Sequence, residues 1–284
     1  VTGSKFLIEA DGKRFLIDCG LFQERNFKNR NWDKLPVEPE SIDFIILTHA
    51  HLDHCGYLPK LVRDGFEGKI YCTEPTEEIV KIALLDAGKL QEEDAEKKRK
   101  RHEKEKRKGP FPEIPLYTVE DAERVFPLFF SKKYEEEIKI SNNISFIFHD
   151  AGHILGSSMI ELNIEENGKK KKIIFSGDIG RWEKVVLEDP TIFNTGDIVF
   201  MESTYGNRLH ENQQEGEEKL KNVINQTVEN GGNIVIPTFA IERAQEILYF
   251  LRKFLLEDQI PHIFVFVDSP MAINVTDVFK KYPE

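Results

Sequence analysis

Potential metal ligands are concentrated in one short segment, residues 48–54, which has the sequence THAHLDH. Within six residues it supplies four candidate ligands: His49, His51, Asp53 and His54. Imidazole nitrogens and carboxylate oxygens suit zinc, and also manganese or iron. His49 and His51 can serve one metal ion, and Asp53 and His54 a neighbouring one. The alternative, a polar surface loop, is disfavoured because two further candidate ligands complete the set.

Those two candidates are single residues that follow apolar runs and lie beside glycines. His153 occurs in the sequence AGHILGS, and Asp178 occurs in FSGDIG. Taken alone, His153 indicates a hydrogen-bonded core residue, and Asp178 indicates a turn residue, because aspartate is common in turns. Together with the His-rich segment, both become candidate metal ligands. The two carboxylate oxygens of Asp178 can then bridge two ions.

Short apolar runs lead towards each candidate ligand and predict the strands that position them. Such runs occupy residues 6–8, 15–17, 44–47, 144–148, 159–164 and 172–175. Asp11-Gly12 and Asn167-Gly168 each separate two runs, which predicts two β-hairpins. Between residues 79 and 90, apolar side chains recur at helical spacing. The pattern predicts stacked sheets covered by helices.

The chain changes character after about residue 206. Apolar stripes predict helices near residues 220–228, 240–256 and 272–282, and all-apolar runs at 233–236 and 263–267 predict buried strands between them. Helices alternating with such strands are typical of βαβ units with a parallel sheet. We therefore predict an α/β protein with two domains, residues 1–206 and 207–284.

Composition limits the class of protein. Apolar residues make up 40% of the 284 residues, and no apolar run reaches the roughly 18 residues of a membrane span. No signal peptide is visible and the cysteines number only three, so we expect a cytoplasmic protein with no membrane partner. A net charge of −11 disfavours a broad, non-specific nucleic-acid binder, because phosphate contacts need Lys and Arg. A homo-oligomer is left open.

One segment departs from this acidic balance. Residues 97–108 have the sequence KKRKRHEKEKRK, and Gly109-Pro110 then ends any helix. A charge block of this kind indicates a solvated helix end or a mobile loop. The alternative is a basic arm that contacts substrate phosphates.

The candidate ligand set resembles that of the metallo-β-lactamase superfamily. His49-x-His51-x-Asp53-His54, His153 and Asp178 match its motifs in order and approximate spacing, and Asp18 in LIDCG matches its first acidic position. Three later segments resemble the β-CASP subfamily of nucleases: FMESTYG at 200–206, PTFAIERAQE at 237–246 and DSPMA at 268–272. The resemblance implies a metallo-β-lactamase αββα sandwich followed by the beginning of an α/β β-CASP cap domain with a parallel sheet.

The resemblance also implies roles for these residues. His49, His51, His153 and Asp178 would hold the first of two divalent metal ions. Zinc is the expected metal, and manganese is the alternative. Asp53, His54 and Asp178 would hold the second. Asp53 would also orient the attacking water, Asp18 would orient the ligand loop, and Glu202 would pair with a general-acid histidine. The implied reaction is endonucleolytic cleavage of single-stranded RNA by a metal-bridging hydroxide, with 5′ exonuclease activity left open.

The sequence differs from the subfamily pattern in one respect, and several other functions compete with the implied one. Members of the subfamily carry two later histidines, and the sequence reaches Glu284 before either motif, so we expect an incomplete second metal site and an inactive isolated fragment. A DNA nuclease of the same fold is one alternative. A thioester hydrolase and a lactamase are disfavoured, because neither needs the cap segments. A non-catalytic scaffold would be expected to lose metal ligands, and every ligand expected before residue 284 is present.

Overall fold

The structure, a computed structural model, describes residues 2–108, 113–208 and 213–283. It divides into two compact units: Val1–Trp182 with Asp189–Glu202, and Glu183–Glu188 with Ser203–Glu284. The main change of unit lies a few residues before the predicted domain boundary, which stays a prediction. Among the described helices, none combines the length and apolar character that crossing a membrane requires.

Two five-stranded sheets form the first unit. The first sheet has the order β1-β2-β3-β4-β5, with β1 antiparallel to β2 and the remaining neighbours parallel. Its strands are β1 (Phe6–Ala10), β2 (Lys13–Ile17), β3 (Phe44–Ile46), β4 (Lys69–Thr73) and β5 (Phe129–Lys132). The 3-10 helices η1 (Lys28–Trp32), η2 (Pro39–Ser41) and η3 (Phe126–Leu128) lie in its connections.

The second sheet has the order β10-β9-β8-β7-β6 and is antiparallel except for the β9–β10 pair. Its strands are β6 (Ile138–Lys139), β7 (Ile144–Asp150), β8 (Ser158–Glu166), β9 (Lys169–Phe175) and β10 (Ile198–Phe200). Both predicted hairpins are confirmed. Asp11, Gly12, Asn167 and Gly168 all have positive φ, the conformation of a type I′ turn, which suits Asn or Asp followed by Gly.

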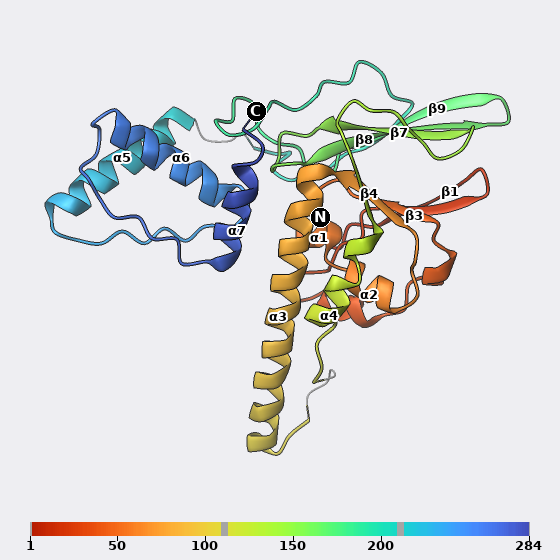
Figure 1. Cartoon of the computed structure of the whole chain (residues 1–284), viewed down its shortest axis with the longest axis horizontal. Coiled ribbons are helices and arrows are strands. Elements are labelled where there is room, and N and C mark those ends of the chain that lie inside the picture. Colours follow the sequence, from red (N-terminus) through yellow and green to blue (C-terminus); the bar gives the residue numbers. More distant parts are fainter. Residues whose placement is uncertain (1, 109–112, 209–212, 284) are drawn as a thin grey trace. The chain divides into compact units, whose positions relative to one another are not determined.

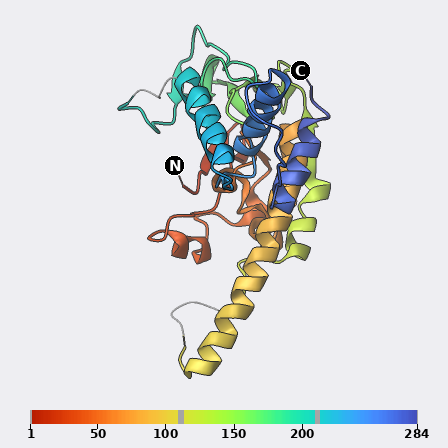
Figure 2. The same cartoon turned by 90° about the vertical axis from the view of Figure 1, so that its left-hand side faces the viewer.

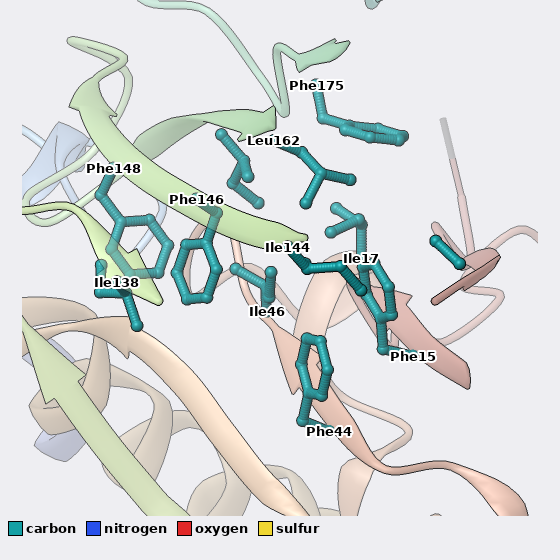
Figure 3. Packing of buried hydrophobic residues seen from close by; sticks show 12 residues of the cluster. Phe15, Ile17, Phe44, Ile46, Ile138, Ile144, Phe146, Phe148, Leu162 and Phe175 are labelled. Atoms are coloured by element: carbon teal, nitrogen blue, oxygen red, sulfur yellow. The ribbon is translucent and has the colours of Figure 1, made fainter. Parts of the chain in front are cut away.

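The core of this unit lies between the two sheets, where alternate side chains of each strand point inward. Figure 3 shows Phe15 and Ile46 from the first sheet near Phe146 and Leu162 from the second. These four side chains are all 0% exposed, and burying a side chain of this size stabilises the fold by about 1.5–3 kcal/mol. The sandwich therefore fixes the strand ends from which the candidate ligands emerge.

In the described part of the first unit, the α-helices follow strands of the first sheet. They are α1 (Leu52–Cys55), α2 (Leu58–Arg63), α3 (Glu74–Glu105) and α4 (Val119–Glu123). Within the described part of this unit, no α-helix follows a strand of the second sheet. The expected α/β fold with two stacked sheets is confirmed, and within the described part of this unit the segments after β6 to β9 are strands and loops.

The first half of the long helix α3 is largely buried, from Pro75 to Gly88, and its second half projects away from both sheets (Figure 1, Figure 2). Thr73 caps it by accepting a hydrogen bond from the Thr76 amide, and Pro75 lies in its first turn, where a missing amide proton costs nothing. Its end is held by the return segment, since Glu113 contacts the buried His102 at 2.5 Å and the Leu116 amide donates to Gln91. Residues 97–105 are thus a helix end, one of the two forms expected for the charged block.

The second unit contains α5 (Gln213–Glu229), α6 (Arg243–Leu256) and α7 (Pro270–Phe279) around a small core. The strands predicted at 233–236 and 263–267 are not formed, so the expected parallel sheet is absent from the described residues. A strand needs a hydrogen-bonded neighbour, and neither segment has one. Apolar side chains in these segments lie exposed instead, with Val235 at 87% and Phe264 at 92%.

Candidate metal centre

The candidate ligands come from both sheets of the first unit. His49 and His51 lie in the loop after β3, and Asp53 and His54 follow directly on α1. From the second sheet, His153 lies in the turn between β7 and β8, and Asp178 follows β9. Both sheets therefore deliver ligands to one end of the sandwich.

Four of these residues form a compact cluster. His49, His51, His153 and Asp178 each offer a ligand atom, and all four atoms lie within 4.8 Å of one another. The His51 Nδ1 atom lies 3.1 Å from His49 Nε2 and 3.2 Å from His153 Nε2. Asp178 Oδ2 lies 3.8 Å and 3.7 Å from the same two Nε2 atoms. Three nitrogens and one oxygen in this arrangement match the ligand set of a single divalent ion.

The remaining candidates lie on the other side of Asp178. His54 Nε2 is 3.3 Å from Asp178 Oδ1 and 3.8 Å from Asp53 Oδ2. Each carboxylate oxygen of Asp178 therefore faces a different set of ligands. All six residues predicted as metal ligands thus lie in one region of the structure.

The chemistry of these atoms fits bound cations. His54 Nε2 is buried and forms no hydrogen bond with any described residue, despite its proximity to Asp178. Leaving a buried polar atom without a partner costs about 1–3 kcal/mol. A cation between His54, Asp53 and Asp178 would accept the lone pair of this nitrogen and remove that cost. Imidazole nitrogens near 3.1 Å apart likewise need a shared proton or a common cation.

Asp18 and Thr48 orient the histidines from behind. Asp18 Oδ2 lies 2.6 Å from His54 Nδ1, and the Thr48 hydroxyl lies 3.0 Å from both Asp18 oxygens and from His49 Nδ1. Because the single hydroxyl proton of Thr48 is donated to Asp18, its oxygen accepts from the N–H of His49. Both imidazoles then donate from Nδ1 and direct Nε2 at the centre.

The pKa values of the two buried histidines, His49 and His54, shift in opposite directions. Burial, together with the neighbouring imidazoles, lowers the pKa of His49 well below its usual range, so this ligand stays neutral. Burial also lowers the pKa of His54, but the carboxylates of Asp18 and Asp178 outweigh it and raise that pKa to about 10. The negative field that holds a proton on His54 also favours a metal cation beside Asp178.

The substitution Asp18→Asn tests this orienting contact. The amide would present a donor or a weaker neutral acceptor to His54 Nδ1, so we expect divalent-metal affinity to fall about 10–100-fold with the fold retained. Competition with a chelator measures the affinity. Asp64→Asn, at the partly exposed C-cap of α2, is the matched control and should bind metal as the wild type does. Equal affinity in both variants would remove Asp18 from the centre.

Three further side chains fix the loops of the second sheet. Ser157 is buried, and its hydroxyl accepts from the amides of His153 and Ile154 at 3.0 and 3.2 Å. Ser158 is buried, and its hydroxyl donates to the Thr48 carbonyl at 3.1 Å. Glu202 Oε1 accepts from the amide of Ile179, the residue after Asp178, at 2.5 Å. These side chains position ligand loops.

Two glycines allow the ligand loops to approach one another closely. A Cβ atom built on Gly20 would lie 1.6 Å from the carbonyl oxygen of Asp53. One built on Gly180 would lie 1.6 Å from the carbonyl oxygen of Gly152, the residue before His153. Any side chain at either position would therefore push a ligand segment away from the centre.

Thr48 and these glycine contacts were not predicted from the sequence. Thr48 directly precedes the His-rich segment, and this position was the available signal for its role. Gly20 and Gly180 each follow a candidate acidic residue by two positions, but their partners lie far away along the chain. Only the structure shows which backbone segment packs against each glycine.

Comparison with known proteins places these observations in a family. Residues 7–202 match the family model described as "Metallo-beta-lactamase superfamily domain", and residues 244–284 match the one described as "Beta-Casp domain". Ribonuclease TTHA0252 of Thermus thermophilus is 36% identical over 99% of this chain and 58% of its own length.

Two other relatives extend the comparison. Transcription termination factor FttA of Methanosarcina mazei is 32% identical over 100% of this chain and 42% of its own length. Cleavage and polyadenylation specificity factor 73 of Drosophila melanogaster is 29% identical over 99% of this chain and 38% of its own length. The chain spans about half the length of the curated relatives it matches.

Proposed function

Because the chain belongs to the metallo-β-lactamase superfamily and its last residues match a β-CASP domain, we propose that it is a metal-dependent phosphodiesterase acting on single-stranded RNA. The observation that carries this proposal is the position of Asp178. One of its oxygens faces His49 and His153, and the other faces His54. A carboxylate placed in this way suits two adjacent cations, the arrangement common among enzymes that cleave phosphodiesters.

We propose zinc for both ions, with manganese as the alternative, because the nitrogen-rich cluster suits zinc. A bound metal pair lowers the pKa of a water molecule and neutralises charge that develops on the phosphoryl oxygens. The protein's own part is to hold the ligands and to orient the water. Asp53, whose side chain is 23% exposed, can accept a hydrogen bond from that water and aim it at phosphorus.

Glu202 is proposed to act on the leaving group indirectly. One of its oxygens is engaged by the Ile179 amide, and the other makes no hydrogen bond with the described residues. That second oxygen can accept from a histidine and raise its pKa, which favours the protonated form needed to protonate a leaving oxygen. No such histidine contacts Glu202 among the described residues, so this role rests on the family resemblance.

The choice of RNA rests on the names of the relatives. One is named a ribonuclease, one a transcription termination factor and one a cleavage and polyadenylation specificity factor. A DNA nuclease of the same fold is the competing enzyme. Labelled single-stranded RNA and DNA of one sequence, offered to the full-length protein with zinc or manganese, separate the two. Preference for DNA would overturn the choice of RNA.

A non-catalytic scaffold is the competing function from another class. It predicts fewer than one tightly bound zinc or manganese ion per full-length chain, whereas the enzyme predicts about two, one for each set of ligands around Asp178. Metal analysis of the purified protein distinguishes these results. The intact set of six ligand side chains supports the enzyme.

The free thiols bear on the cellular compartment. Cys19, Cys55 and Cys72 are all buried and unpaired with one another. Burial raises the pKa of Cys19 to about 12 and that of Cys55 well above its usual range, so these thiols stay protonated and do not compete for metal. Buried free thiols are typical of a reducing environment, and we propose the cytoplasm.

Replacing Asp53 tests its role in catalysis. Asp53→Ala removes the carboxylate that orients water and one candidate ligand of the second ion, so we expect cleavage of RNA to be abolished. The backbone carbonyl of Asp53, which accepts from the Ser4 amide, is unaffected, and the fold should be retained. Rates with labelled RNA and a circular dichroism melt are the measurements. Unchanged turnover would remove Asp53 from the mechanism.

A further inference from the structure

The end of α3 has a charge opposite to that of the chain. Residues 97–108, named here the basic arm, contain nine Lys or Arg side chains and two Glu, a net charge of +7 in a chain of −11. Within the arm only His102 is buried and Lys98 is half-buried, so the other side chains are exposed to solvent. The segment before it is acidic, and the positive charge is therefore confined to the tip of the helix.

Ion pairs within the helix neutralise only part of this charge. Lys97 and Lys100 pair with Glu93 and Glu96, one turn earlier. Five basic residues form no ion pair with any residue that the structure describes: Arg99, Arg101, Lys104, Lys106 and Lys108.

The spacing of the cations opposes a purely structural role. Lys97 and Arg101 are four residues apart, as are Lys100 and Lys104, so like charges lie side by side on the helix and destabilise it. One or two cations would suffice to interact favourably with the negative end of the helix dipole. The excess positive charge would be stabilised by a polyanion bound along the arm.

The same helix begins beside the metal centre. The hydroxyls of Thr73 and Thr76 donate to the Gly156 carbonyl, at 2.6 and 2.7 Å, in the turn that carries His153. From Thr76 to Arg99 the helix rises by about 35 Å, at 1.5 Å per residue. The arm is therefore a rigid extension of the unit that holds the centre, at a distance that only a polymeric ligand can span.

We infer that the basic arm binds the sugar–phosphate backbone of an RNA strand, remote from the point of cleavage. The inference rests on the proposed function. Lys and Arg are the side chains that neutralise phosphates, and such contacts do not depend on base sequence. At about 3.4 Å per stacked nucleotide, roughly ten nucleotides are needed to span 35 Å. Long substrates engage the arm, and substrates of five nucleotides do not reach it.

A triple substitution tests this assignment in the full-length protein. Arg99→Gln/Arg101→Gln/Lys104→Gln removes three exposed cations and keeps good helix formers in place. For a 30-nucleotide RNA we expect KM to rise about 5–20-fold with kcat unchanged. For a five-nucleotide RNA we expect no change in either constant. Binding of the longer RNA in EDTA should lose about two units of its log–log salt slope, near 0.7 per phosphate contact.

The matched control changes the same charge elsewhere in the first unit. Lys139→Gln/Lys169→Gln/Lys170→Gln lies on β6 and β9, and Lys139 and Lys170 are highly exposed and pair only loosely with Glu137 and Glu165. This variant should match the wild type on both substrates. Equal losses in the two variants would show a general effect of net charge and overturn the inference.

Other outcomes separate the arm from the proposed function. If the wild-type protein cleaves both RNAs and the arm variant behaves identically, the inference that the arm binds RNA is overturned. The proposed function then still stands. A wild-type protein that cleaves neither RNA contradicts the proposed function, while an arm-dependent salt slope in EDTA still supports RNA binding. Arm-dependent sedimentation with vesicles one-third phosphatidylserine, without arm-dependent RNA binding, would assign the arm to a membrane surface and overturn the inference.

Discussion

Asp178→Asn is expected to lower kcat/KM for RNA by about 10³-fold or more and to remove at least one metal ion from the chain. The carboxylate has both oxygens directed at candidate ligand sets, one towards His49 and His153 and the other towards His54. An amide offers a single neutral oxygen and cannot serve both sides. Losing metal-based charge stabilisation costs several kcal/mol, and each 1.36 kcal/mol changes the rate about tenfold.

Steady-state cleavage of labelled RNA and metal analysis of the purified variant check this result. Asp64→Asn makes the same chemical change on a partly exposed aspartate that faces Lys60 and is expected to retain full activity and metal content. A thermal melt shows whether each variant remains folded. An Asp178→Asn protein that is folded, holds two ions per chain and cleaves at the wild-type rate would refute the bridging role.

Gly180→Ala is expected to reduce activity about 10²-fold although residue 180 bears no ligand atom. The added Cβ would lie 1.6 Å from the Gly152 carbonyl oxygen and 2.7 Å from the His153 amide, so the two loops must separate. Their hydrogen bond, from the Gly180 amide to the Ala151 carbonyl, would be strained at the same time. A displacement of about 1 Å in reacting groups can cost 10²-fold in rate.

Metal content and activity should fall together in this variant, because the displaced segments carry His153 and Asp178. Gly216→Ala is the control: it lies in α5 with nothing within 4 Å of the added Cβ, and it should be neutral or slightly stabilising. Gly20→Ala should act as Gly180→Ala does, through Asp53 and His54. Full activity in both Gly180→Ala and Gly20→Ala would show that the loops adjust without disturbing the centre.

The candidate ligands could be predicted because each is a His or Asp residue that follows an apolar run in the sequence. Strand ends of packed sheets gather at one edge, so His49, His153 and Asp178 could be expected together despite their separation in sequence. The family and fold class implied by the motifs are confirmed by the matched domains, and the two hairpins by their turn geometry. The domain boundary and the individual roles of the ligands stay predictions.

Other features could not be predicted, because they depend on contacts between residues that are distant in the sequence. The strands expected at 233–236 and 263–267 have the apolar composition of buried strands but lack hydrogen-bonded neighbours in the described chain. The role of Thr48 could not be predicted from the sequence, because it depends on the contacts of its hydroxyl with Asp18 and His49. Gly180 required knowledge of a backbone segment about thirty residues earlier.

The division of the ligand set between two sheets also constrains how the protein matures. His51 and His153, whose ring nitrogens lie 3.2 Å apart, are separated by 102 residues, and Asp178 comes later still. A nascent chain therefore cannot assemble the cluster until β9 has left the ribosome and docked. Closing so long a loop is slow, so the apoprotein must first fold largely through its apolar sandwich. We therefore expect loading with metal to be a late event that follows folding of the sandwich.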